Sequence, residues 1–262
     1  MRLSVLAALL TVILAGAVCA EPLPGLPARV LQAPPDDIAD DAPSRARLLH
    51  LFMDGVLRSE RGTPAPVARW AGPVAITLTG LVAPYAGFVT DLAAELAGLT
   101  GLPVSVTADG SPPAANGIDV YLAANPRYWP AGVRSADPAV TVFTCAAAPG
   151  VREGIIRRST IRINAGVLDP DTVRACLLEE IVQSMGLLGE LDGEGDTLLD
   201  DRVGFEHLGA VDRLLLRTLY DPRLTPGMAR DAARPLAAAI LEEGLAHLAC
   251  EDKGDGRRCQ LR

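Results

Sequence analysis

One long helix with clear start and stop signals constrains the fold of this chain more than any other feature. Asp169 is a residue type that caps helix starts, and Pro170 suits the first helical position. Gly186 suits the left-handed position that ends helices, so the predicted helix runs to about Met185. We expect the rest of the chain to be organised around this helix.

Three polar residues in this helix form a recognisable frame. Glu179 and Gln183 are four residues apart and share one helical face, and Glu180 follows Glu179. With Gly186, the Glu-Glu-x-x-Gln frame resembles the His-Glu-x-x-His helix of zincin peptidases, whose histidines bind zinc and whose glutamate is the general base. A carboxylate and a neutral amide are weak zinc ligands. We therefore expect no catalytic zinc, although Glu180 keeps the position of the general base.

The first 20 residues predict a secretory signal peptide. A charged start at Arg2 precedes an apolar run from Leu3 to Val18, and the small residue Ala20 predicts cleavage after it. The apolar run is shorter than the roughly 18 residues that span a bilayer, so no transmembrane segment is expected after processing. We expect a periplasmic or secreted protein; the alternative is a lipoprotein anchored through Cys19.

The charge balance bears on the kinds of partner. The formal net charge is −8 and no cluster of lysine and arginine stands out. Nucleic acids and anionic membranes attract clustered positive charge, so neither is expected as a partner. A peptide or protein of the cell envelope is the expected partner.

The cysteines after the signal peptide predict two disulfides, since an even number in an exported protein favours bridges over reactive thiols. Cys250 and Cys259 flank a polar, glycine-containing turn that a bridge can close. Cys145 and Cys176 are then left to pair, which ties a strand to the start of the central helix.

Apolar periodicity gives the order of the remaining elements. We expect helices at 44–61, 85–99, 208–220 and 229–248, and strands at 74–79, 102–107, 118–123, 140–146 and 154–164. The fold class is therefore α/β (α+β): a zincin-like, twisted mixed sheet of about five strands, backed by the central helix, with a helical C-terminal part. The expected parts are a signal peptide at 1–20, a Pro-rich linker (21–43) and N-terminal helix within 21–68, a zincin-like domain at 69–228, and a C-terminal helix with a disulfide-closed tail at 229–262.

Two longer motifs are similar to those of one family. Residues 176–187 read Cys-Leu-x-Glu-Glu-x-x-Gln-x-x-Gly-Leu, and residues 219–228 read Leu-Tyr-Asp-Pro-Arg-Leu-x-x-Gly-Met. They resemble the domain-of-unknown-function family numbered 2927, which comprises exported and lipoprotein-like proteobacterial proteins. The resemblance covers about residues 70–228 and implies a fold and an exported location, without an activity.

The resemblance to zincins of the metzincin type is more distant. The helix that ends in Leu-Tyr matches their plan, but Gly189 stands where their third zinc-binding histidine lies. Their methionine turn is also missing, because no methionine lies between Met185 and Met228.

An acidic segment follows the central helix, with six carboxylates between residues 190 and 201. Asp192, Glu194 and Asp196 alternate as in the opening of a calcium loop. Thr197 and Val203 replace the glycine and glutamate that an EF-hand requires, so an EF-hand is excluded. A structural Ca²⁺ at Asp192, Glu194 and Asp196 competes with a solvated acidic loop.

Two functions compete for the central frame. We favour a non-catalytic envelope protein that binds a peptide or protein in a relic cleft lined by Glu179, Gln183 and Asp192, without a cofactor. The alternative is a peptidase-like hydrolase with an altered or absent metal, which uses Glu180 as general base.

The histidines offer no separate metal motif. His50, His207 and His247 are far apart in the sequence, and none forms a pair four residues apart.

Overall fold

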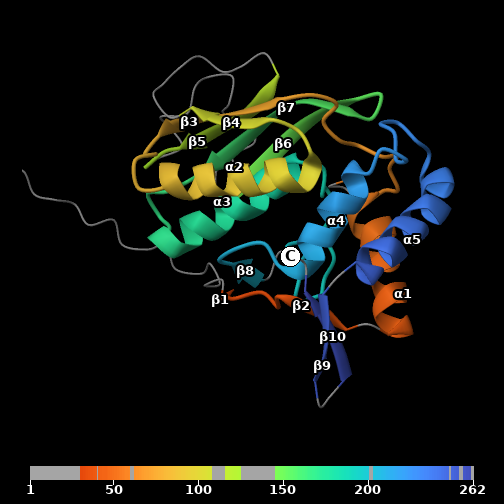
Figure 1. Cartoon of the computed structure of the whole chain (residues 1–262). Coiled ribbons are helices and arrows are strands. Elements are labelled where there is room, and N and C mark those ends of the chain that lie inside the picture. The colour runs from red at the N-terminus through yellow and green to blue at the C-terminus, as the bar shows by residue number, and fades with distance from the viewer. Residues whose placement is uncertain are drawn as a thin grey trace, which may run out of the picture.

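A five-stranded mixed sheet with helices on one face forms the centre of the computed structural model (Figure 1). The structure describes residues 30–39, 41–59, 62–107, 116–124, 145–200, 203–247, 249–253 and 256–260. The sheet order is β4-β3-β5-β7-β6, in which only the edge strand β6 is antiparallel to its neighbour. The strands are β3 (Val74–Gly80), β4 (Val104–Thr107), β5 (Gly117–Leu122), β6 (Cys145–Arg152) and β7 (Ile155–Ile163). The predicted α/β class with a five-stranded mixed sheet is confirmed.

Alternation along the central strands sets the two faces of this sheet. In β3, Ile76 and Leu78 are fully buried, as are Ile118 and Val120 of the neighbouring β5. These apolar side chains form the core with the helices, because successive residues of a strand point to opposite faces. The other face carries polar residues, of which Asp119 accepts a hydrogen bond of 2.7 Å from Nε of Arg158.

The edge strand β6 extends further than expected. The sequence predicts a strand at 140–146, and β6 instead runs from Cys145 to Arg152; residues 140–144 lie outside the described part. The observed strand includes Pro149 and Gly150. Proline is tolerated at the edge of a sheet, where its missing N–H faces away from the neighbouring strand. The hairpin to β7 turns at Glu153 and Gly154, both with positive φ.

Two helices pack on this sheet, α2 (Ala86–Thr100) and α3 (Pro170–Ser184). Beyond them, α4 (Ala210–Tyr220) packs on α2, and α5 (Arg230–Ala246) packs on α4. The central helix α3 has its predicted ends. Oδ1 of Asp169 accepts hydrogen bonds of 3.0 Å from the N–H groups of Asp171 and Thr172, and Gly186 follows the helix with a φ of 119°. Figure 1 shows α2 and α3 beneath the same face of the sheet.

The N-terminal part is more ordered than the predicted linker. β1 (Val30–Gln32) pairs in parallel with β8 (Val203–Phe205), and β2 (Asp37–Ala39) pairs with β10 (Gly256–Gln260). The expectation of a linker was therefore wrong for these strands. Ile38 explains part of the difference, because its side chain is only 5% exposed and joins the core.

The helix predicted at 44–61 ends earlier than expected and changes from an α-helix to a π-helix. α1 (Ala42–His50) continues as a π-helical segment, η1 (Leu51–Val56). The chain then reverses: the N–H of Ser59 donates to the carbonyl of Thr63 over 2.9 Å, and Gly62 has a φ of 71°. A helix cannot continue through this turn, which is why it ends before Arg61.

One predicted disulfide is confirmed. Cys145 of β6 is bonded to Cys176 of α3 and thereby ties the edge strand to the central helix. Cys259 is also disulfide-bonded, and the register of β10 with β9 (Ala249–Lys253) places Cys250 opposite it. That position suits the predicted Cys250–Cys259 bridge.

None of the helices in the described residues has both the length and the apolar character that a membrane crossing needs.

Candidate functional site

The central-helix frame lies inside the protein. Glu179 is 5% exposed and Glu180 is 6% exposed, whereas Gln183 is half-buried. Neither glutamate lacks an interaction partner. A general base must come within hydrogen-bond reach of the proton it removes, so a buried Glu180 does not favour catalysis.

The position expected for a third zinc ligand is closed by backbone. A Cβ atom on Gly189 would lie 2.1 Å from the carbonyl oxygen of Gly55 in η1. Gly186 is similarly confined, since its Cβ would lie 2.5 Å from the carbonyl oxygen of Ala68. A histidine at residue 189 therefore has no room in this arrangement.

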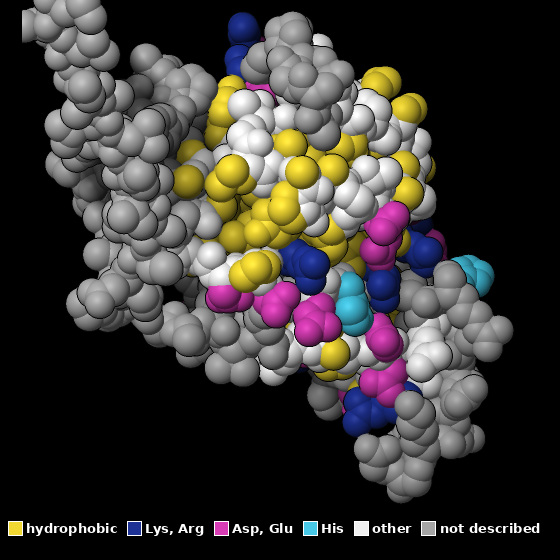
Figure 2. Space-filling view, turned by 90° about the vertical axis from the view of Figure 1, so that its left-hand side faces the viewer, with side chains coloured by type: hydrophobic (Ala, Val, Ile, Leu, Met, Phe, Trp, Pro, Cys, Tyr) yellow, Lys and Arg dark blue, Asp and Glu magenta, His cyan; other side chains and the backbone are white. Residues whose placement is uncertain are grey.

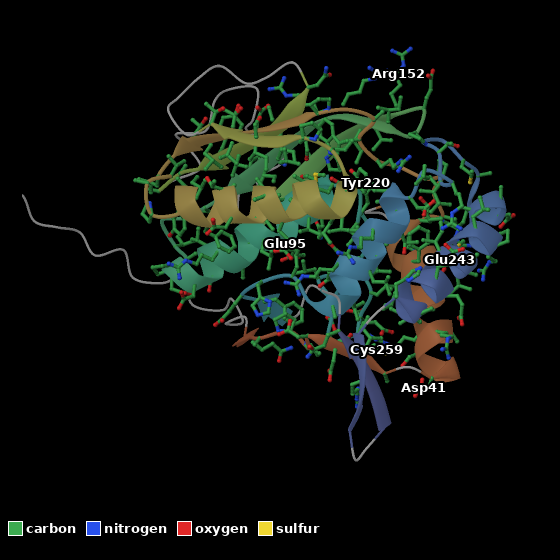
Figure 3. All side chains as sticks on the ribbon, in the orientation of Figure 1. Asp41, Glu95, Arg152, Tyr220, Glu243 and Cys259 are labelled. Atoms are coloured by element: carbon green, nitrogen blue, oxygen red, sulfur yellow. A yellow bond between two sulfur atoms is a disulfide. The ribbon has the colours of Figure 1, made fainter. Side chains whose placement is uncertain are left out.

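The Leu-Tyr motif holds the end of the central helix. Tyr220 donates its hydroxyl proton to the carbonyl of Met185 over 2.8 Å, and the indole N–H of Trp70 donates to the carbonyl of Ser184 over 2.8 Å. These carbonyls have no partner within the helix, so the two aromatic residues satisfy them. Burial raises the pKa of Tyr220 well above its usual value. Figure 3 shows Tyr220 where α4 meets the central helices. This motif therefore has a structural role.

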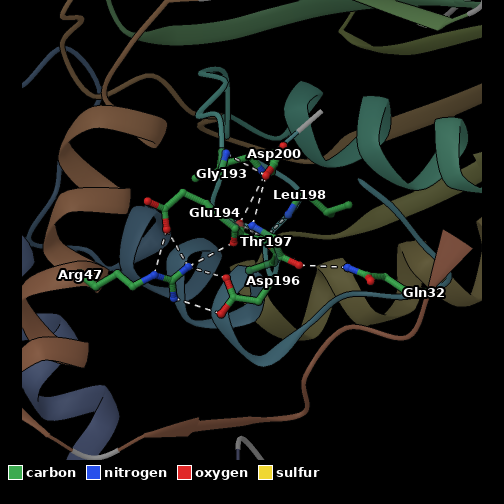
Figure 4. Close-up of polar contacts among 11 residues, drawn as sticks. Gln32, Arg47, Gly193, Glu194, Asp196, Thr197, Leu198 and Asp200 are labelled. Atoms are coloured by element: carbon green, nitrogen blue, oxygen red, sulfur yellow. Dashed lines mark hydrogen bonds and ion pairs between the residues drawn. The ribbon is translucent and has the colours of Figure 1, made fainter. Parts of the chain in front are cut away.

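The acidic segment is bound to Arg47 of α1, a contact that the sequence did not predict. Nε of Arg47 donates to Glu194 Oε2 over 2.9 Å, and Nη1 donates to Asp196 Oδ2 over 3.0 Å (Figure 4). Nη2 also forms an ion pair with Asp196. Two of the three predicted calcium ligands thus surround a guanidinium group, while Asp192 is exposed. No pattern in the sequence predicts that Arg47 contacts Glu194 and Asp196, because α1 is far from them along the chain.

The rest of this segment is held by two further carboxylates. Asp200 accepts hydrogen bonds from the N–H groups of Gly193 and Gly195 over 3.0 and 3.2 Å. Asp212 of α4 is fully buried, and burial raises its pKa to about 6 against the opposing effect of hydrogen bonds from Thr197 and Leu198. The loop is therefore held in place by hydrogen bonds to Asp200 and to Asp212 of α4. Within the described ranges, no group of three His, Cys, Asp or Glu side chains is arranged to hold a metal ion.

The three histidines lie on separate elements. Nδ1 of His50 is 3.0 Å from Oδ2 of Asp54, and His247 follows the end of α5. His207 lines an open cavity together with Asp36, Arg213 and Gln260. No pattern in the sequence groups these four residues, because Asp36 and Gln260 are far along the chain from His207 and Arg213.

The outer edge of β6 is the other feature with chemical consequences. The N–H of Ala123 donates to the carbonyl of Ile163 over 3.2 Å, so Ile163 of β7 directs its backbone groups toward β5. Ile163 lies opposite Cys145 and Ile161 opposite Ala147. Backbone direction alternates along a strand, so Cys145 and Ala147 point their N–H and C=O groups away from β7. No strand of the described chain pairs with that side.

Charge on the visible surface is mixed. Figure 2 shows a broad apolar area bordered by a band in which acidic, basic and histidine side chains alternate. This face therefore has no extended area of one charge.

Comparisons with known proteins gave one match. Residues 45–239 match the family model described as "Protein of unknown function (DUF2927)". No curated protein and no solved structure gave a significant match.

Proposed function

The chain belongs to the DUF2927 family of proteins of unknown function, and from that premise we propose that it is an exported, non-catalytic protein that binds an extended peptide or protein segment. The family lends no activity, so the proposal rests on geometry. The outer side of β6, with which no strand of the described residues pairs, is the observation that carries it. An exposed row of backbone donors and acceptors is a template for an added strand.

The edge strand has the rigidity that such binding needs. Its bond to Cys176 fixes Cys145 to the central helix, with 5.9 Å between the Cα atoms. Ala147 offers an outward N–H and C=O, and Val151 adds an exposed apolar side chain. A pre-ordered edge loses less conformational entropy when it accepts a partner strand.

The same geometry disfavours the hydrolase alternative. Glu179 and Glu180 are buried, and the backbone leaves no room for a side chain at Gly189. Both observations are consistent with a zincin-like site that has lost its zinc ligands. The sheet with an antiparallel edge strand and a buried central helix supports the zincin-like plan as part of the proposal. A cofactor is not required for strand addition.

Export is supported by two observations. Residues 1–20 have the pattern of a signal peptide, and the Cys145–Cys176 bridge is typical of proteins in oxidising compartments. We propose a periplasmic or secreted location, with a lipid anchor at Cys19 as the alternative.

Binding to a library of extended peptides, measured by fluorescence anisotropy with the mature protein, tests the proposal. Ala147→Pro removes an outward N–H without removing a bond to β7, and we expect at least a roughly tenfold loss of affinity. Ala147→Ser keeps the N–H and is the matched control. Equal peptide binding by Ala147→Pro and Ala147→Ser, with both variants folded, would contradict strand addition.

Peptide hydrolysis is followed in the same samples. Cleavage that is lost in Glu180→Gln, with unchanged thermal stability, would replace the binding proposal with the hydrolase alternative. Intact peptides with the wild-type protein are the expected result.

A further inference from the structure

An open polar cavity of about 440 Å³ lies apart from the central frame and the edge strand. Asp36 follows β1, His207 lies between β8 and α4, Arg213 belongs to α4 and Gln260 to β10. Ligand pockets of proteins commonly have volumes of about 300 to 1,000 Å³, so this cavity suits a small molecule.

The carboxylate of Asp36 is only loosely paired with Arg213, whereas Nε of Arg213 is firmly paired with Glu95. Nη1 of Arg213 lies 3.5 Å from Oδ1 of Asp36, a separation beyond ordinary hydrogen-bond length. Nε of the same guanidinium donates to Oε1 of Glu95 on α2 over 2.7 Å, which fixes its orientation. Asp36 has an exposed side chain, at 62%, whereas Arg213 is 24% exposed. A positioned guanidinium therefore stands beside an accessible carboxylate.

The two remaining side chains supply neutral donors and acceptors. Nδ1 of His207 is 3.1 Å from the carbonyl oxygen of Leu208. In the neutral imidazole this contact places the proton on Nδ1, and Nε2 is then an acceptor. The amide of Gln260 both donates and accepts hydrogen bonds. All four described lining residues are thus polar.

The balance of these groups selects the class of ligand. A simple anion bound at Arg213 would be repelled by two carboxylates, those of Glu95 and Asp36. A simple cation bound at Asp36 would be repelled by Arg213. A molecule with one carboxylate and one ammonium group satisfies both. We propose that this cavity binds a free amino acid with a small polar side chain, with its carboxylate at Arg213 and its ammonium group at Asp36.

In this arrangement His207 and Gln260 contact the ligand's polar side chain. A neutral donor and acceptor pair favours a hydroxyl or amide over an alkyl group, because an alkyl group would leave both without partners. The site is independent of peptide binding at β6, so either proposal can fail without the other.

Isothermal titration calorimetry of the mature protein with L-serine tests the proposal against its two single-charge analogues. Ethanolamine lacks the carboxylate, and 3-hydroxypropanoate lacks the ammonium group. We expect L-serine to bind at least about tenfold more tightly than either analogue. Comparable affinity for 3-hydroxypropanoate would show a simple anion site and would overturn the proposal. No binding of L-serine, L-asparagine or L-glutamine at about 10 mM would also overturn it.

Two variants locate the binding. Asp36→Asn removes the partner of the ammonium group and should weaken L-serine binding by at least about tenfold. Glu206→Gln makes the same chemical change on the exposed residue next to His207, outside the cavity lining, and should leave affinity unchanged. Equal affinities of the two folded variants would contradict the assignment.

Discussion

Thr197 donates its hydroxyl proton to Oδ1 of Asp212 over 2.6 Å, which joins the acidic segment to α4 inside the protein. The N–H of Leu198 donates to the same oxygen over 3.0 Å. The second oxygen, Oδ2, is buried without a hydrogen-bond partner. The carboxyl group of Asp212 therefore holds the acidic segment in place, while its burial disfavours its ionised form.

Stability should depend on pH through Asp212. Burial raises its pKa from 3.8 to about 6, so the folded protein binds the proton more tightly than the unfolded chain does. This group therefore adds stability as pH falls from about 6 to about 4, by up to about 3 kcal/mol, and the gain is lost as pH rises through about 6. Urea denaturation across this range should show that Asp212→Asn removes this component. Exposed Asp231→Asn is the control, and the same pH dependence in all three proteins would contradict the role.

Replacement of Arg47 should loosen the acidic segment. Arg47→Ala leaves Glu194 and Asp196 without their shared cation, and we expect a loss of about 1 to 3 kcal/mol in the free energy of unfolding. Limited proteolysis should cut the segment faster. Arg217→Ala, on the exposed side of α4, should change neither result.

The same variant tests the calcium hypothesis. Carboxylates released from Arg47 become available to a hard cation. Calcium should therefore raise the melting temperature of Arg47→Ala more than that of the wild type. A large stabilisation of the wild type by calcium would instead indicate a site in the native loop.

A side chain at residue 189 should not be tolerated. Gly189→Ala places a methyl group against the backbone carbonyl of Gly55, and we expect a loss of about 3 kcal/mol or more in thermal or urea unfolding. Gly195→Ala is matched, because its Cβ meets nothing within 4 Å. Equal stability of the two variants would contradict this prediction and would show that the backbone at Gly55 can shift to make room for the methyl group.

Loss of one hydroxyl group should weaken the end of α3. Tyr220→Phe leaves the carbonyl of Met185 buried without its donor, at a cost of about 1 to 3 kcal/mol. Tyr85→Phe, at another buried tyrosine, is the comparison. Chemical denaturation of both variants measures the difference, and an equally small effect would exclude this role of the motif.

Local signals explain which elements the sequence predicts well. Asp169 caps α3 through its own side chain, and the alternation around Ile76 requires only neighbouring residues. The contact of Arg47 with Asp196 depends on two distant segments, and no periodicity reveals it. The full extent of β6 was also not predicted. It includes Pro149, and a proline is tolerated there because β6 is an edge strand, which only the assembled sheet defines.

The predicted site was accessible to sequence reasoning only in part. The frame of Glu179 and Gln183 correctly indicates a shared helical face, but burial depends on what packs over that face. The cavity at Asp36 and Arg213 brings together residues from opposite ends of the chain, so its chemistry follows from tertiary structure alone.

The pairing of β2 with β10 places Ile38 opposite Cys259, residues that are made early and late in synthesis. The three-stranded sheet of β2, β10 and β9 cannot close until the last of these strands has emerged. Ile38, which is buried in the finished protein, must therefore remain exposed while most of the chain is made. Completion of folding therefore waits for the last described strand, which favours folding after synthesis of the chain over folding during synthesis.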